Sequence, residues 1–220
     1  MAIPRNLVAA LDEALERGDV PSSTDALEAL AQYGEEALPH ISHALKHADP
    51  EIRMTSLSCL VEASDGSPVP QFVAALGDPD EEVQQFAMDI LSDMEDPRAL
   101  PTLLAHLDNP DRSMRSAAAL GLGNQGDQSL VPRLLGMMSD QSSVVRESVI
   151  TALGKLRAPA AVAALAAVLR SDDELVNRKS AAFALSRIGT PEALETLRTL
   201  RDDPDPILRG YGNNPVRSTW

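Results

Sequence analysis

Residues 145–154 read Val-Arg-Glu-Ser-Val-Ile-Thr-Ala-Leu-Gly, and the Val145-Arg146 pair that opens this stretch recurs along the chain. At each of six anchor positions, a basic or amide residue follows an aliphatic one, directly or after one further residue. Successive anchors are 31, 31, 31, 32 and 31 residues apart. A fixed period of this length indicates stacked supersecondary units. The anchors are Arg53, Gln84, Arg115, Arg146, Arg178 and Arg209.

The residues around each anchor predict two helices per period. Asp or Asn followed by Pro precedes several anchors, as at Asp49-Pro50 and Asp78-Pro79. This pair is typical of an N-cap and a first helical position. Seventeen residues after an anchor, a second proline (Pro70, Pro101 or Pro132) is expected to open a second helix. Each helix carries one apolar face, and a lone pair cannot bury both faces, so neighbouring pairs must stack.

We therefore predict an all-α fold, a right-handed α-solenoid of about six helix pairs with an N-terminal capping helix. Residues 1–20 are expected to form the cap and residues 21–209 the repeats. An extended C-terminal tail is expected over 210–220, because Gly210, Gly212 and Pro215 oppose helix formation. The expected repeat units are about 21–48, 49–77, 78–108, 109–139, 140–171 and 172–202, with a partial unit over 203–209.

Charge is distributed unevenly along the chain, whose formal net charge is −14. Residues 1–110 contain 5 basic and 21 acidic side chains, whereas residues 111–220 contain 14 and 12. Nucleic-acid binding needs clustered Lys and Arg, so this composition argues against it. The acidic N-terminal half can steer a partner protein with a basic surface. The alternative is that the acidic surface only keeps the protein soluble.

The single cysteine, Cys59, excludes a disulfide within the chain and is expected to be a buried thiol rather than a nucleophile. The N-terminus has no apolar stretch typical of a signal peptide. The longest apolar run, residues 158–169, is about half of the roughly 20 residues that a membrane span needs. We therefore expect a cytoplasmic protein with no membrane partner.

Residues 96–104, Asp-Pro-Arg-Ala-Leu-Pro-Thr-Leu-Leu, together with Val145-Arg146 and Ala152-Leu153-Gly154, resemble HEAT repeats of the short bacterial kind named for phycobilisome lyases. The resemblance covers roughly residues 22–209 and implies HEAT-like helix pairs. Members of that family include partner-binding scaffolds, subunits of bilin lyases and a few metal enzymes. The resemblance is thus specific for the fold and much less so for a function.

Two activities found on HEAT-like folds do not fit the sequence. Deoxyhypusine hydroxylase binds iron through repeated His-Glu pairs, and no His-Glu dipeptide occurs here. DNA glycosylases of HEAT-like fold hold DNA in a basic groove, and the N-terminal half of this chain has the opposite charge.

The polar residues of the repeats predict mainly structural roles. Each anchor arginine is expected to join a ladder in which its guanidinium meets a carboxylate or carbonyl of the adjacent turn. His40, His43 and His47 are expected on one face of a single helix, with His106 on the same side two repeats later. A solvated face is favoured over a metal site or a pH-sensitive contact, so we predict neither a metal nor another cofactor.

In solenoids of this kind the second helices line the concave face, where non-core side chains can contact a partner. These side chains are polar toward the N-terminus and small or apolar around residues 133–169. An exposed apolar strip within a polar rim is typical of a protein contact, and the alternative is that closer packing covers it. The predicted partner-binding residues are His40, His43, Gln71, Thr102, His106, Arg133, Met137, Ala164 and Val168.

No motif for catalysis accompanies these features: the sequence has no P-loop, nucleophile elbow or Cys-x-x-Cys pair. We predict a noncatalytic protein–protein interaction scaffold or adaptor. The alternative is an accessory subunit of a bilin lyase, or a chaperone for a tetrapyrrole-binding protein, and it rests on the resemblance alone.

Overall fold

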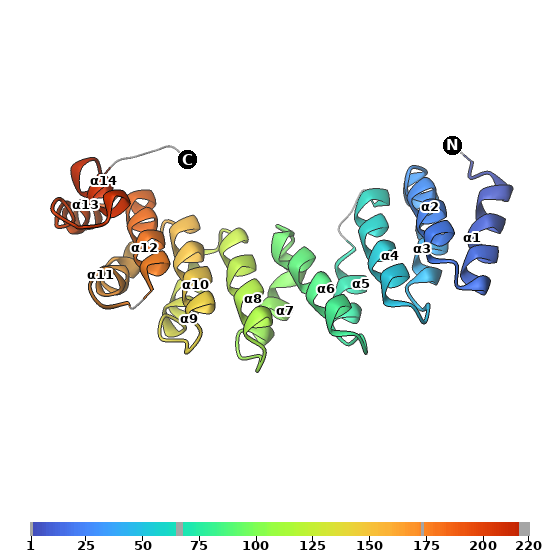
Figure 1. Cartoon of the computed structure of the whole chain (residues 1–220), viewed down its shortest axis with the longest axis horizontal. Coiled ribbons are helices and arrows are strands. Elements are labelled where there is room, and N and C mark those ends of the chain that lie inside the picture. Colours follow the sequence, from blue (N-terminus) through green and yellow to red (C-terminus); the bar gives the residue numbers. More distant parts are fainter. Residues whose placement is uncertain (1, 65–67, 173, 216–220) are drawn as a thin grey trace. The chain divides into compact units, whose positions relative to one another are not determined.

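The structure, a computed structural model, describes residues 2–64, 68–172 and 174–215, and there the chain consists of helices joined by short turns, with no strand (Figure 1). It divides into two compact units, Met1–Leu91 and Ser92–Trp220. The predicted all-α class is confirmed. The helices are α1 (Arg5–Arg17), α2 (Val20–Ala31), α3 (Leu38–Ala44), α4 (Pro50–Ala63), α5 (Val69–Ala75), α6 (Glu81–Asp93), α7 (Leu100–His106), α8 (Arg112–Asn124), α9 (Val131–Gly136), α10 (Ser143–Lys155), α11 (Val162–Ser171), α12 (Leu175–Ile188), α13 (Pro191–Arg198) and α14 (Pro206–Asn213).

Helix pairs account for nearly all of the described chain. Six pairs run from α2 with α3 to α12 with α13, and α14 begins a further first helix. The prolines predicted to open second helices, Pro70, Pro101 and Pro132, are the second residues of α5, α7 and α9. Short 3-10 turns lead into four of the second helices: η1 (Gly34–Ala37), η2 (Pro97–Ala99), η3 (Gln128–Leu130) and η4 (Pro159–Ala161).

Helix α1 caps the first pair, as predicted. Its Leu11 and Ala14 are buried and it packs along α2. Its other side carries the exposed charged residues Asp12, Glu13 and Glu16. A terminal helix with an apolar inner face and a charged outer face is what the end of a repeat stack requires.

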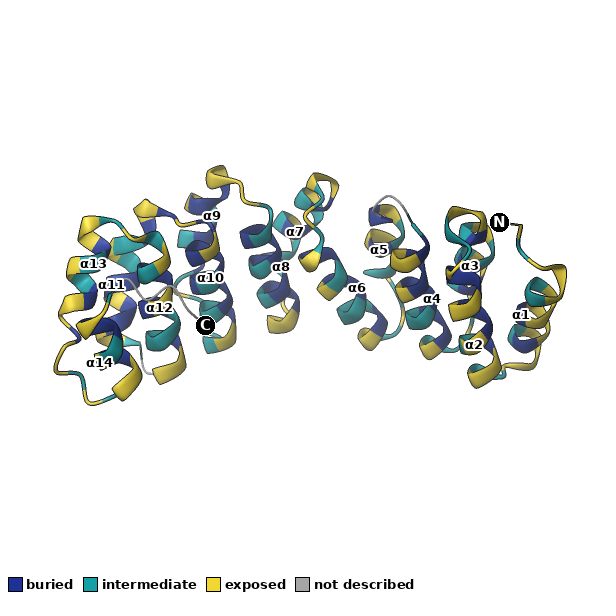
Figure 2. Ribbon diagram, turned by 90° about the horizontal axis from the view of Figure 1, so that it is seen from above, coloured by how far each residue is buried: buried dark blue, intermediate teal, exposed yellow. Residues whose placement is uncertain are grey.

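Small residues set the close packing of the first helices in the second unit, where α10 packs against both α8 and α12 (Figure 1). A Cβ atom added to Gly123 would lie 2.6 Å from Ala152 Cα, and one added to Gly154 would lie 2.9 Å from Ala184 Cβ. The helix backbones therefore approach more closely than larger side chains would allow. Figure 2 shows the resulting pattern, with buried residues between stacked helices and exposed residues at the turns.

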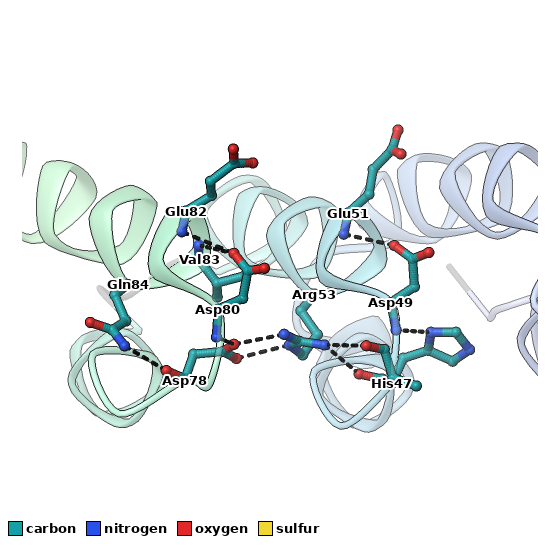
Figure 3. A network of polar contacts seen from close by, with 10 residues as sticks. His47, Asp49, Glu51, Arg53, Asp78, Asp80, Glu82, Val83 and Gln84 are labelled. Carbon is teal, nitrogen blue, oxygen red and sulfur yellow. Dashed lines mark hydrogen bonds and ion pairs between the residues drawn. The ribbon is translucent and has the colours of Figure 1, made fainter.

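Anchor arginines join neighbouring repeats in a ladder, as the sequence predicts, and Figure 3 shows the rung formed by Arg53 and Asp78. Arg53 Nε and Nη2 donate to Asp78 Oδ2 and Oδ1 at 2.8 and 2.6 Å, while Nη1 donates to the carbonyl oxygens of His47 and Ala48 at 2.8 Å. The Arg53 and Asp78 side chains are only 8% and 11% exposed. Two further rungs in the second unit have the same form, Arg115 with Asp140 and Arg146 with Asp172.

The ladder varies where the anchor is not a single arginine. Gln84 Nε2 donates to the carbonyl oxygen of Asp78 at 2.6 Å, and an amide cannot form an ion pair. Near the C-terminus Lys179, which follows the anchor Arg178, forms the ion pair with Asp205 at 2.9 Å.

The predicted helix caps are right at Asp49-Pro50 but lie two residues too early in later repeats. Asp78 does not cap a helix, because Arg53 holds its carboxylate and its Oδ1 also accepts from Asp80 N at 2.9 Å. Asp78 thus closes the turn that precedes the cap. The capping residues are Asp80, Asp111 and Asp205, which accept from Glu82 N, Ser113 N and Ile207 N.

The prediction of an extended tail over 210–220 is wrong for residues 210–213, which continue α14. The two glycines there serve packing: a Cβ on Gly212 would lie 2.4 Å from Arg201 N, so only glycine permits the contact. The adjacent Tyr211 is buried, and its burial favours the helix over the extended chain. Residues 216–220, including Trp220, lie outside the described residues.

We expect Gly123→Ala to destabilise the protein by about 1–3 kcal/mol, because the new Cβ meets the backbone of α10 rather than a movable side chain. Urea unfolding measures the change. Gly136→Ala is the matched control: nothing lies within 4 Å of its added Cβ. The control should be neutral or stabilising by up to about 1 kcal/mol. Equal losses in the two variants would contradict the role of the close contact.

The Arg115–Asp140 rung predicts a pH dependence of stability. Hydrogen bonds from Arg115 hold the pKa of Asp140 below its ordinary value of 3.8, although partial burial opposes them. Because the folded-state pKa is depressed, the stabilisation is present above the ordinary value and is lost as pH falls toward the folded-state value. The free energy of unfolding should therefore differ more between wild type and Asp140→Asn at pH 7 than at pH 3. The exposed Asp108 provides the control, since Asp108→Asn should show a small difference at both pH values.

Candidate protein-binding surface

The first unit contains a hollow of about 370 Å³ between the second helices α3 and α5, named here the α3–α5 hollow. Its walls are largely aliphatic, and side chains of both helices and of α4 contribute to them. Its lining residues are Ser42, Leu45, Lys46, Arg53, Leu57, Pro70, Gln71, Ala74, Ala75, Asp78 and Val83.

Charged groups of the ladder contribute to this hollow. The hydrogen bonds to Asp78 raise the pKa of Arg53 against the opposing effect of burial, and the charges of Asp80 and Asp49 act in the same direction. Three carboxylates therefore lie within electrostatic range of the Arg53 guanidinium. The second cation is Lys46, an exposed lining residue for which the described residues provide no ion pair.

Gln71, a lining residue of the same hollow, has one buried polar atom. Its Oε1 is shielded from solvent and has no hydrogen-bond partner among the described residues. An unsatisfied buried acceptor costs about 1–3 kcal/mol, so a donor that reached Gln71 would recover part of this free energy.

The second unit repeats the hollow between α9 and α11, with a volume of about 480 Å³; it is named the α9–α11 hollow. Most of its residues correspond to those of the first hollow at an offset of 93, three periods of 31, so that Ala167 takes the place of Ala74. Asp172, which pairs with Arg146 as Asp78 pairs with Arg53, lies at an offset of 94. Its lining residues are Leu135, Met138, Ser139, Asp140, Arg146, Ala164, Ala167, Val168, Ser171 and Asp172.

The equivalent positions in the repeats of α7 and α9 carry different residues. Arg133 stands at the position of Gln71, and Asp108 at that of Lys46, each two periods later. Their side chains form an ion pair. The surface at these equivalent positions therefore differs from one repeat to the next.

Three predicted binding residues line the hollows: Gln71 in the first, and Ala164 and Val168 in the second. The structure does not place Met137 there, because this side chain is buried with only 6% exposure. Its neighbour Met138 lines the α9–α11 hollow instead. The side chain that faces the hollow at the end of α9 is therefore one residue later in the sequence than predicted.

The histidines are arranged differently from the expectation. His40 is half-buried and His43 exposed on α3, and neither is a lining residue. His47 lies beyond the end of α3, so the three do not share one helix. Its Nδ1 accepts from Asp49 N at 3.0 Å and its Nε2 lies 3.1 Å from the Leu15 carbonyl oxygen. His47 thereby occupies the turn position that Asp78 fills in the next repeat.

The remaining predicted residues make local contacts. The Thr102 carbonyl oxygen lies 2.8 Å from His106 Nδ1, one helical turn away, and both residues are half-buried. The described residues contain no group of three or more His, Cys, Asp or Glu side chains that could hold a metal ion.

The sequence-based prediction did not include the residues at or just after the C-terminal end of the first of the two helices that form each hollow. Leu45 and Lys46 line one hollow, and Met138 and Ser139 line the other. A hollow between two stacked helices takes residues from both, so the same periodicity that identified Gln71 and Ala164 could have identified these four.

Two further features concern reactivity and exposed apolar surface. Burial raises the pKa of the Cys59 thiol to about 11, with smaller contributions from Glu62 and Glu28, so the thiolate is disfavoured.

Most large hydrophobic side chains exposed in the described residues belong to α10, α12 and α14: Val144, Leu175, Val176, Phe183 and Ile207.

Comparisons with known proteins agree with this architecture. A model of HEAT repeats matches residues 38–122 and again 102–186, and a model of the PBS lyase HEAT-like repeat matches residues 178–203. Among curated proteins the comparison found no match. Within the described residues, no helix is both long and apolar enough to cross a membrane.

Solved structures of similar fold include the YibA protein of Escherichia coli, with 15% identity over 98% of this chain and 83% of that chain and a TM-score of 0.68. The complex of CpcE and CpcF of phycocyanin lyase from Nostoc sp. PCC7120 matches with 19% identity over 99% and 96% of the two chains and a TM-score of 0.57. An engineered protein matches with 19% identity over 97% and 96% and a TM-score of 0.55. At these identities the likeness is one of fold. With the repeat model covering most of its length, the chain belongs to the family of HEAT-repeat proteins.

Proposed function

We propose that this protein is a noncatalytic adaptor that holds a segment of a partner protein along the exposed face of its second helices. The observation that carries the proposal is the recurrence of a hollow at equivalent positions in the two units, each with a small exposed alanine, Ala74 or Ala167, among its lining residues. Hollows of this kind accept side chains of a bound segment.

The charge distribution supports a partner with a basic surface. Residues 1–91 contain 4 Lys or Arg and 17 Asp or Glu side chains. A surface of one sign accelerates encounter with a partner of the opposite sign. The disfavoured thiolate of Cys59 argues against this residue as a nucleophile.

The alanines within the hollows provide the test. Ala74→Glu and Ala167→Glu should each lower partner capture by at least about tenfold, because a carboxylate would be buried against an apolar contact. Capture from an extract of the native host is measured by pulldown with quantitative mass spectrometry. Circular dichroism should show unchanged helicity, since both alanines are exposed.

Ala163→Glu is the matched control, because Ala163 is an exposed alanine of α11 outside the α9–α11 hollow. It should retain wild-type capture. Loss of capture in this variant equal to that in Ala167→Glu would place the contact elsewhere on the protein.

A second candidate function is an accessory subunit of a bilin lyase or a chaperone for a tetrapyrrole-binding protein. The match of residues 178–203 to the PBS lyase HEAT-like repeat favours it. This function requires contact with a pigment or with a pigment-carrying protein.

This alternative is tested by purifying the protein from its native host. A lyase-related role predicts visible absorbance in the purified protein, or recovery of a pigmented protein with it. A colourless preparation that still captures an unpigmented partner would favour the adaptor.

A further inference from the structure

We propose that the first helices α10, α12 and α14 form a second docking surface, which binds an amphipathic helix of a partner protein that carries apolar and acidic side chains. The centre of this surface is a hollow of about 400 Å³, named here the α10–α14 hollow. It shares no lining residue with the α9–α11 hollow, so the proposal does not depend on the binding proposed above. Its lining residues are Thr151, Lys179, Ser180, Phe183, Ile207 and Tyr211.

Apolar side chains are exposed in this hollow and beside it. Phe183 and Ile207 are each 38% exposed. Val144 and Val176 hold the position of Ile207 in α10 and α12, two residues before the anchor, and both are exposed. Because α12 packs against both α10 and α14 (Figure 1), these three positions form a row across neighbouring helices. Exposed apolar surface that continues over several helices is typical of a protein contact.

Two cations flank one end of the hollow. Lys155 and Arg187 follow Thr151 and Phe183 by four residues, which places each cation one helical turn beyond a lining residue on the same face. Both side chains are exposed, and the described residues provide no carboxylate partner for either. Lys155 Nζ donates to the neutral Asn124 Oδ1 at 2.6 Å. This end of the hollow is therefore positive and favours an acidic group of a ligand.

The other charged groups near the hollow do not reverse this preference. Lys179, the charged lining residue, forms its ion pair with Asp205 at 2.9 Å, so the two charges balance. Glu147 and Glu174 lie toward the N-terminal ends of α10 and α12, on the other side of the hollow from the two unpaired cations. The surface is thus positive at one end only, which would orient a bound acidic helix.

The same helix face has the opposite character in α4 and α6. Residues two before, five after and nine after the anchor share one face of a helix. In α10 and α12 these residues are Val144, Thr151 and Lys155, and Val176, Phe183 and Arg187. In α4 and α6 they are Glu51, Ser58 and Glu62, and Glu82, Asp89 and Asp93.

The repeat fold therefore does not require apolar and basic residues on this face. Cations in the last turn of a helix complement its dipole, but Glu62 and Asp93 occupy the same last-turn position in α4 and α6. The dipole thus does not dictate the residue at this position. A partner of complementary chemistry accounts for the apolar row and the two cations together.

The dimensions of the row suit a helix as the ligand. Packed helices lie about 8–10 Å apart, so a row over three of them extends roughly 20 Å. A helix of about 13 residues covers that length. A stripe of apolar side chains with carboxylates beside it would place the stripe on the row and the carboxylates at Lys155 and Arg187.

Two synthetic peptides test the proposal on the full-length protein. Both are amphipathic helices of about 16 residues with the same leucine stripe, flanked by Glu in one peptide and by Lys in the other. Binding is followed by the methyl NMR signals of Val144, Val176 and Ile207. The Glu peptide should shift these signals saturably and bind there at least fivefold more tightly than the Lys peptide, although the net charge of −14 opposes it. Equal binding, tighter binding of the Lys peptide at these signals, or no saturable shift with the Glu peptide would overturn the proposal.

A charge placed in the hollow tests the apolar contact. Phe183→Glu should weaken binding of the Glu peptide at least tenfold, because a carboxylate would take the place of an apolar contact and repel the ligand. Val61→Glu is the matched control, since Val61 is an apolar residue of the first helix α4 with a similar exposure of 43%. It should leave binding unchanged. Equal binding by the two variants would contradict the proposed site.

Variants of the two exposed cations test the charge preference without altering the apolar surface. Arg187→Gln should weaken binding of the Glu peptide about threefold, as expected for one exposed charge a few ångströms away. Lys155→Glu combined with Arg187→Glu should reverse the preference in favour of the Lys peptide. Arg170→Gln, at an exposed arginine of α11 outside the hollow, should have no effect. A preference for the Glu peptide that persists in the double variant would overturn the proposal.

An anionic membrane is the other surface that exposed apolar and basic residues can meet. Sedimentation with phosphatidylglycerol vesicles distinguishes it from a protein helix. The protein should remain in the supernatant if the ligand is a helix. Sedimentation with the vesicles that is lost in Phe183→Glu would overturn the proposal in favour of a lipid surface.

Discussion

The repeat architecture depends on a buried guanidinium that its own repeat cannot satisfy. Arg53 carries five N–H donors, and the turn before its own helix supplies two carbonyl oxygens, both taken by Nη1. The donors on Nε and Nη2 find the two oxygens of Asp78, which belongs to the next turn. A buried charge without its partner is strongly destabilising, so each such repeat requires the one that follows.

Asp78, whose carboxylate pairs with Arg53, also stabilises the turn in which it lies. Asp78 Oδ1 accepts from Asp80 N, and Asp80 then caps α6. One residue thus couples packing between repeats to the start of the next first helix. In the first repeat His47 takes the turn position and its Nδ1 accepts from Asp49 N, while its Nε2 reaches the carbonyl of Leu15 in α1 instead of an arginine. The capping helix is therefore joined to the stack through a histidine side chain in place of the Arg–Asp ion pair.

Most of the fold could be predicted from the sequence, because the 31-residue period and the apolar faces are properties of local sequence. The cap register could not, since Asp78 and Asp80 are both good capping residues and a contact 25 residues away decides between them. The helix through Gly210 and Gly212 was missed for a similar reason. Helix propensity opposes it, and the close approach to Arg201 that requires Gly212 is tertiary.

The residues that line the hollows were predicted less well than the fold, because they depend on helix rotation at single-residue precision. Met137 and Met138 are adjacent and chemically identical, yet one is core and the other lines the hollow. Periodicity locates the exposed face of a helix to within about one residue, which is enough to find Gln71 and Ala164 but not to choose between two methionines.

The division between constant and variable positions explains how one architecture can offer different surfaces. Arg53 and Asp78 recur as Arg146 and Asp172, because the ladder requires them in both hollows. The ladder does not involve the other lining side chains at the positions of Lys46 and Gln71. These change from Lys46 and Gln71, through the ion pair of Asp108 and Arg133, to Ser139 and Ala164. These side chains can therefore change without weakening the stack, since the residues that hold the repeats together are not the residues that distinguish one hollow from the next.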